Sequence, residues 1–140
     1  MIITGEDVIA EARRWLETRY VHQGRTRFGV DCIGYVICVR NAIDPIPDIM
    51  REVTNYARNP QAVLIERIQK YCTRIHTPEV GCIILIRWFK DEHPSHAAIY
   101  AGETMMHSYK NAGKVVEVGY RAQWVRWTHS FWRMPGVTAA

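Results

Sequence analysis

Residues 30–36, VDCIGYV, place a cysteine directly after an aspartate at the start of an apolar segment. Asp31 is a residue type that caps helix N-termini, so the sequence predicts a helix from Cys32 to about Asn41. The positive end of a helix dipole can lower the pKa of a thiol, and the free N–H groups there can bind an oxyanion. A catalytic cysteine fits this position, although a cysteine at a helix start is more often structural.

Outward from this segment, the hydrophobic pattern changes from helical spacing to short apolar runs. Thr4 and Asp7 have the spacing of a capping box at the start of the first helix. Residues 20–30 have the composition of a loop. Because helices come first and strands second, the sequence predicts an α+β fold. Helices are predicted over residues 5–18, 32–41 and 60–72 (capped by Asn59), and strands over 82–86, 96–100, 104–108, 114–118 and 130–133.

Length and composition indicate one globular domain. The chain has 140 residues, of which 48% are hydrophobic and 23% charged, and this length predicts a single domain over residues 1–140. The net charge of +4 favours approach to an anionic polymer. The sequence has no run of five basic residues and no aromatic-basic RNA-binding signature, so we do not expect a nucleic-acid partner.

The N-terminal stretch MIITGEDVIAEARRW lacks the basic region, the apolar region and the cleavage site of a signal peptide. We therefore expect synthesis in the cytoplasm without a signal peptide. No apolar run approaches the roughly 18 residues that span a bilayer, so we expect no membrane insertion.

Cysteine and histidine are the residue types that bear on catalysis. Cys38, Cys72 and Cys82 have apolar neighbours and are predicted to be buried hydrophobic residues. Any of six histidines could serve as the base for Cys32. His96 opens a predicted strand and His107 lies in the next one, so adjacent antiparallel strands would place these imidazoles side by side and let one orient the other.

Four pieces of sequence occur in an order typical of a known family. They are RYVHQGR with Tyr20, VDCIGYV with Cys32, SHAAIYAG with His96 and MMHS with His107. Together, over about residues 9–118, they resemble the NlpC/P60 family of cysteine peptidases.

The resemblance implies a papain-like α+β fold with N-terminal helices packed on a C-terminal antiparallel sheet. It implies that Cys32 is the nucleophile, His96 the base and His107 the residue that orients His96. The Tyr20 hydroxyl and the Cys32 backbone N–H would bind the oxyanion, and Asp31 would recognise the free amine of the substrate. No cofactor or metal is implied.

The resemblance also implies hydrolysis of an amide bond in a peptidoglycan stem peptide, typically after D-γ-glutamate. The HQGR stretch, residues 22–25, and Ile33 are most similar to the phage-type branch of the family, which includes proteins of gene transfer agents. Many bacterial members have Ser where this chain has Ile33. This branch implies tail proteins as partners and delivery to the cell wall in a phage tail or virion.

Three other functions remain open from the sequence. The chain could be a structural or assembly component of a phage tail that keeps the peptidase fold. Cys32, His96 and His107 could instead form a zinc site, since their number and type suit that metal. A Cys/His amidase or acyltransferase acting on another substrate would use the same residues.

Overall fold

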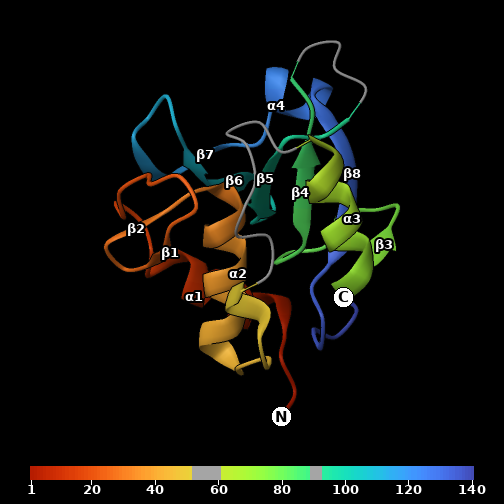
Figure 1. Cartoon of the computed structure of the whole chain (residues 1–140). Coiled ribbons are helices and arrows are strands. Elements are labelled where there is room, and N and C mark those ends of the chain that lie inside the picture. The colour runs from red at the N-terminus through yellow and green to blue at the C-terminus, as the bar shows by residue number, and fades with distance from the viewer. Residues whose placement is uncertain (52–60, 89–92) are drawn as a thin grey trace.

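The computed structural model describes residues 1–51, 61–88 and 93–140, and it confirms the predicted α+β class. The N-terminal helices pack against a six-stranded antiparallel sheet built from the C-terminal half of the chain (Figure 1). This arrangement of layers is the one that the sequence resemblance implies.

The first helix, α1 (Gly5–Arg13), begins at the predicted capping box. The Thr4 hydroxyl accepts a hydrogen bond from the Asp7 N–H, and the Asp7 carboxylate accepts one from the Thr4 N–H. The helix ends five residues before the predicted end at Thr18, so that boundary is wrong. Glu17 has a φ of 74° and its N–H donates to the Val115 carbonyl, which turns the chain toward the sheet edge instead of continuing the helix.

The central helix, α2 (Cys32–Ile43), starts at Cys32 as predicted and runs two residues beyond the predicted end. It stops at Asp44, directly before Pro45, because proline disfavours the helical conformation of the residue that precedes it. The helix α3 (Gln61–Tyr71) agrees with the predicted third helix, while the predicted cap Asn59 and first residue Pro60 lie outside the described residues.

The sheet has the strand order β3-β8-β4-β5-β6-β7, and all its pairs are antiparallel. The five predicted strands are present. The sequence pattern did not predict the short edge strand β3, the hairpin β1–β2 inside the predicted loop, the 3-10 turn η1 (Ile49–Arg51) or the helix α4 (Gln123–Arg126). The strands are β1 (Arg25–Thr26), β2 (Gly29–Val30), β3 (Thr73–Ile75), β4 (Ile83–Ile86), β5 (His96–Tyr100), β6 (Thr104–Tyr109), β7 (Lys114–Gly119) and β8 (Thr128–Arg133).

The strand β4 is apolar at every position because the sheet is covered on both faces. Ile83 and Leu85 pack into the core beneath α2, and Ile84 and Ile86 pack into a second cluster around Trp124 of α4. Successive side chains of a strand point to opposite faces, so continuous burial requires cover on each side. The sheet is therefore covered on both faces, which leaves the ends of its strands available for a site.

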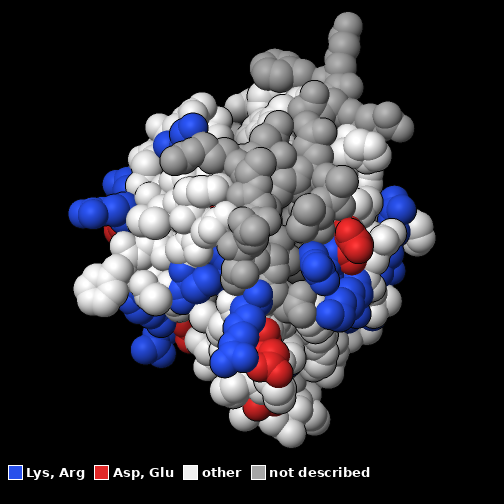
Figure 2. All heavy atoms as spheres, in the orientation of Figure 1, with Lys and Arg blue, Asp and Glu red and all other residues white. Residues whose placement is uncertain are grey.

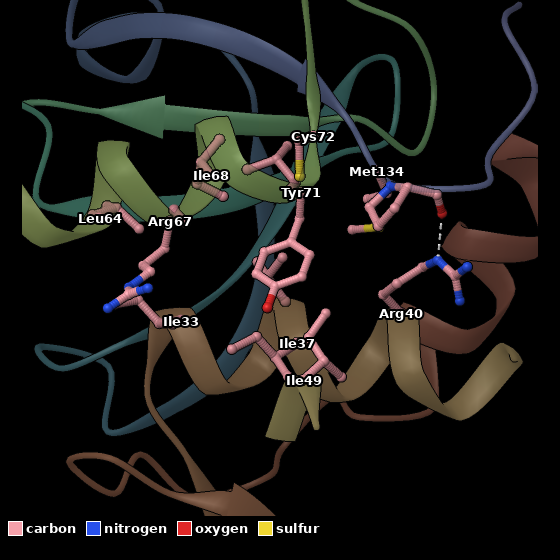
Figure 3. Close-up of a pocket in the computed structure, with 14 residues that line it drawn as sticks. Ile33, Ile37, Arg40, Ile49, Leu64, Arg67, Ile68, Tyr71, Cys72 and Met134 are labelled. Carbon is pink, nitrogen blue, oxygen red and sulfur yellow. Dashed lines mark hydrogen bonds between the residues drawn. The ribbon is translucent and has the colours of Figure 1, made fainter. Parts of the chain in front are cut away.

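A small apolar cavity of about 60 Å³ lies between α2, α3 and the sheet (Figure 3). Tyr71 and Ile68 of α3 face Ile37 of α2 across it. At its far end, the Arg40 guanidinium donates a hydrogen bond of 2.6 Å to the Pro135 carbonyl, which ties α2 to the C-terminal segment. This cavity does not include Cys32.

Lys and Arg side chains are spread in several groups over the face shown in Figure 2, with acidic side chains beside some of them. Within the described ranges, none of the helices combines the length and the apolar character that crossing a bilayer requires.

Candidate active site

Cys32 is the first residue of α2, and Asp31 caps that helix. Asp31 has an extended backbone, with φ −92° and ψ −171°, and its Oδ1 accepts a hydrogen bond of 2.7 Å from the Gly34 N–H. A Cβ at position 34 would lie 2.0 Å from the Gly24 carbonyl oxygen. Only glycine therefore lets the loop before the hairpin pack directly on the first turn of the helix, which fixes where Cys32 stands.

Asp31 is 2% exposed, and its side chain contacts the loop and the hairpin. Its Oδ2 accepts from the Gln23 N–H at 2.9 Å, and the Arg25 guanidinium lies 3.4 Å from Oδ1. Through these contacts Asp31 both caps α2 and binds the preceding loop. Asp31 is not among the residues that line the cleft around Cys32. Its expected contact with the substrate amine stays a prediction.

His96 and His107 lie side by side, as the strand pattern predicts. His96 opens β5, His107 lies on the neighbouring antiparallel strand β6, and the His96 Nε2 and His107 Nδ1 atoms are 2.7 Å apart. Because Nε2 of His96 is engaged with His107, Nδ1 is the nitrogen left to accept a proton. A neutral His96 that carries its proton on Nε2 would donate it to His107 and keep Nδ1 as a base.

Aromatic rings enclose the two imidazoles. Trp88 lies 5.1 Å from the His96 ring, while Tyr109 stacks on His107 at 4.9 Å and Trp124 meets it edge to face at 5.0 Å. Burial holds the pKa of His96 well below its usual range, with a smaller effect from His107, and burial lowers the pKa of His107 to about 4. Both imidazoles are therefore neutral at pH 7.

The Cys32 thiol is also neutral in this conformation. Burial raises its pKa to about 12, and the Asp31 carboxylate acts in the same direction. Hydrogen bonds from the Ala97 and Ile33 backbone N–H groups oppose this shift but are weaker. The helix start therefore acts on this pKa in the expected direction, but the loss of hydration around an 8% exposed residue outweighs it, so the net pKa is raised.

Cys32 and His96 open into one cleft of about 360 Å³. The Ala97 N–H contact places the Cys32 sulfur at the start of β5, next to His96. Tyr20 reaches the same cleft, so the structure brings together Tyr20, Cys32 and His96, with His107 behind His96. The roles assigned to these residues stay predictions. The cleft is lined by Tyr20, Cys32, Trp88, Ser95, His96, Ser108, Tyr109, Lys110, Asn111 and Trp127.

Sequence reasoning missed several of these lining residues. Ser95 directly precedes His96, so its position in the motif could have indicated it. Ser108 and Tyr109 are the last residues of β6, and Lys110 and Asn111 begin the turn that follows. Only the folded structure shows that this end of β6 borders the cleft. The remaining histidines do not line the cleft.

A zinc site formed by Cys32, His96 and His107 is not supported. Across the described ranges, no three His, Cys, Asp or Glu side chains are grouped so that they could hold a metal ion. The short contact between His96 and His107 also directs one nitrogen of each ring at the other ring, so these two nitrogens cannot both bind one ion.

The NlpC/P60 family model matches residues 17–133. The structure is similar to an NlpC/P60 family protein from Bacillus cereus, with a TM-score of 0.70 and 18% identity over 94% of this chain and 40% of that chain. It is also similar to the NlpC/p60 domain of the peptidoglycan hydrolase SagA, with a TM-score of 0.60 and 18% identity. This likeness covers 94% of this chain and 98% of the SagA domain.

A third similar structure is an N-acetylmuramoyl-L-alanine amidase from Bacteroides uniformis, with a TM-score of 0.58 and 15% identity over 93% of this chain and 98% of that chain. No curated protein matches the chain in sequence. The chain spans less than half of the Bacillus cereus protein, and at these identities the likeness establishes the fold. Because the family model covers most of the chain and the fold agrees with it, this chain belongs to the NlpC/P60 family.

Proposed function

We propose that this chain is a cysteine peptidase that hydrolyses an amide bond in peptidoglycan stem peptides. The observation that carries the proposal is the convergence of Cys32 and a hydrogen-bonded His96–His107 pair at one open cleft. A thiol at a helix start, with an imidazole base that a third residue orients, is the arrangement that acyl transfer requires. Membership of the family and the likeness to the peptidoglycan hydrolase SagA support the substrate class.

Because the Cys32 thiol and the His96 imidazole are both neutral before the reaction, the first step must include transfer of a proton between them. His96 Nδ1 takes the proton from the Cys32 thiol as the sulfur attacks the carbonyl carbon, so the charged pair forms only along the reaction. His107 accepts the Nε2–H bond and stabilises the imidazolium that forms. The backbone N–H of Cys32 and the Tyr20 hydroxyl bind the oxyanion.

Collapse of the tetrahedral intermediate breaks the carbon–nitrogen bond. The imidazolium of His96 gives its proton to the leaving amine, and the acyl group stays on the Cys32 sulfur as a thioester. Water, deprotonated by His96, then attacks the thioester carbonyl. The carboxylic acid leaves, and the thiol takes back its proton.

The finer part of the proposal concerns the bond and its setting. The family resemblance supports a cut after D-γ-glutamate. The HQGR stretch and Ile33 support a phage-type protein that is made in the cytoplasm and reaches the wall in a tail, with tail proteins as partners. Proteomics of purified phage particles tests this setting, and finding the chain only in cells and never in particles would contradict it.

One observation favours a second candidate. The similar structure from Bacteroides uniformis is an N-acetylmuramoyl-L-alanine amidase, so a different amide of the wall is the alternative cut. The two reactions leave different products. Cleavage within the stem leaves a shortened peptide on the glycan, whereas the amidase reaction removes the whole peptide.

Mass spectrometry of peptidoglycan fragments after incubation with the protein tests both candidates. We expect a new stem-peptide product from the wild type and none from Cys32→Ala. Cys38→Ala is the matched control, because Cys38 is a buried cysteine of the same helix outside the cleft, and it should give the wild-type product. Equal product from wild type and Cys32→Ala would refute the assignment of the nucleophile.

A further inference from the structure

The hydroxyl of Ser95 is buried in the wall of the cleft without a hydrogen-bond partner. Ser95 is 5% exposed, directly precedes His96 and lines the cleft with Cys32. Among the described residues, its Oγ finds no donor or acceptor. Buried hydroxyls are nearly always paired, because they lose their hydrogen bonds to water on burial.

Two other buried serines show the usual situation. Ser108 donates from its hydroxyl to the Val30 carbonyl at 2.7 Å, although it lines the same cleft. Ser130 accepts from the Trp132 indole N–H at 2.7 Å, on a part of the sheet outside the cleft. Among the buried serines that the structure describes, Ser95 is therefore the one whose hydroxyl lacks a partner, and it is the serine beside the reacting residues.

The backbone anchors Ser95 beside the start of β5. The Ser95 N–H donates to the Ile86 carbonyl at 3.1 Å, directly before β5 begins at His96. Ala97, two residues further along, has the N–H that contacts the Cys32 sulfur. Ser95 and Cys32 line the same cleft, so a group bound at that sulfur occupies the cleft that Ser95 borders.

We propose that Ser95 is a substrate-binding residue whose hydroxyl donates a hydrogen bond to the carbonyl oxygen that Cys32 attacks. This inference rests on the proposed peptidase function. The bound peptide supplies the acceptor that the free protein lacks, and the bond strengthens as negative charge develops on that oxygen. The cost of the unpaired hydroxyl in the free protein is recovered in the transition state.

The test compares Ser95→Ala with Ser130→Ala on a stem peptide that the wild type cleaves. For Ser95→Ala we expect kcat/KM to fall roughly 10- to 100-fold, the scale of one hydrogen bond to a charged group, while Tm stays the same or rises. For Ser130→Ala we expect a lower Tm with kcat/KM within about two-fold of wild type, because this serine has its partner inside the protein.

A second pair of variants separates the hydroxyl from side-chain volume. Thr and Val have nearly the same shape, so Ser95→Thr should keep most of the activity that Ser95→Val loses. The rate at which iodoacetamide alkylates Cys32 should be the same in wild type and Ser95→Ala, which shows that the Cys32–His96 pair is intact.

The outcomes distinguish a failure of the role of Ser95 from a failure of the proposed peptidase function. Wild-type kcat/KM in Ser95→Ala, or equal losses in Ser95→Thr and Ser95→Val, would overturn the role of Ser95 and leave the peptidase proposal standing. A lower Tm in Ser95→Ala together with a slower alkylation of Cys32 would also overturn it, since the serine would then be structural. A wild type that releases no peptide would overturn the peptidase function and this inference with it.

Discussion

Replacing Asp31 with alanine removes the acceptor on which the start of α2 depends. The carboxylate accepts from the Gly34 N–H at 2.7 Å and from the Gln23 N–H at 2.9 Å. It also lies 3.4 Å from the Arg25 guanidinium, and both side chains of this ion pair are nearly buried. The substitution therefore affects the cap, the loop and a buried charge at the same time.

The magnitude follows from these contacts. Loss of an N-cap costs about 1 to 2 kcal/mol, and breaking a buried ion pair by removing one partner costs about 3 to 5 kcal/mol. The contributions share one carboxylate and do not add, so we expect the free energy of unfolding of Asp31→Ala to fall by about 3 to 5 kcal/mol. Asp31→Asn keeps an oxygen for Gly34 but loses the charge, and we expect a smaller loss.

Denaturant unfolding monitored by tryptophan fluorescence measures these losses. Asp44→Ala is the control, because Asp44 is an exposed acidic residue at the other end of α2, and its substitution should change stability by less than about 0.5 kcal/mol. A loss below about 1 kcal/mol in Asp31→Ala would refute the claim that this carboxylate holds the site together.

Three further predictions follow from the site. Gly34→Ala places a Cβ 2.0 Å from the Gly24 carbonyl oxygen, so the free energy of unfolding should fall by about 1 to 3 kcal/mol and Tm should fall with it. An unchanged Tm would contradict this close packing. His107→Ala leaves His96 Nε2 without its partner, so kcat should fall about 100-fold or more while Cys32 stays in place, and a loss of less than about three-fold would contradict the orienting role. The folded pKa values of His96 and His107 lie below 6.5, so the unfolded chain binds more protons on acidification. The contribution of these imidazoles to the free energy of unfolding should therefore be constant above pH 6.5 and fall between pH 6.5 and about 4, by up to about 1.4 kcal/mol per pH unit for each imidazole. Urea titrations at several pH values across this range measure the slope. A wild type without this slope, or an equal slope in His107→Ala, would contradict the prediction.

The features that the sequence predicted well depend on local pattern. The capping box at Thr4, the helix start at Cys32 and the limits of β5 follow from residues within a few positions of one another. The adjacency of His96 and His107 followed because two consecutive strands joined by a short glycine-containing turn pair antiparallel.

The features that were missed depend on distant parts of the chain. The early end of α1 reflects the hydrogen bond from Glu17 to Val115 on β7, and the short strand β3 exists only because β8 returns beside it. The raised pKa of Cys32 depends on how completely the folded chain excludes water from the thiol, which no spacing in the sequence reports. The single-domain organisation over residues 1–140 stays a prediction.

The covalent intermediate on Cys32 tests the central claim most directly. Wild-type protein is mixed with a stem peptide, quenched in acid within the first turnover and digested, and the fragment that contains Cys32 is weighed by mass spectrometry. We predict an added mass equal to the acyl half of the substrate on that fragment, and no such mass in His96→Ala. Product release without any adduct on Cys32, persisting in Cys32→Ala, would contradict the account.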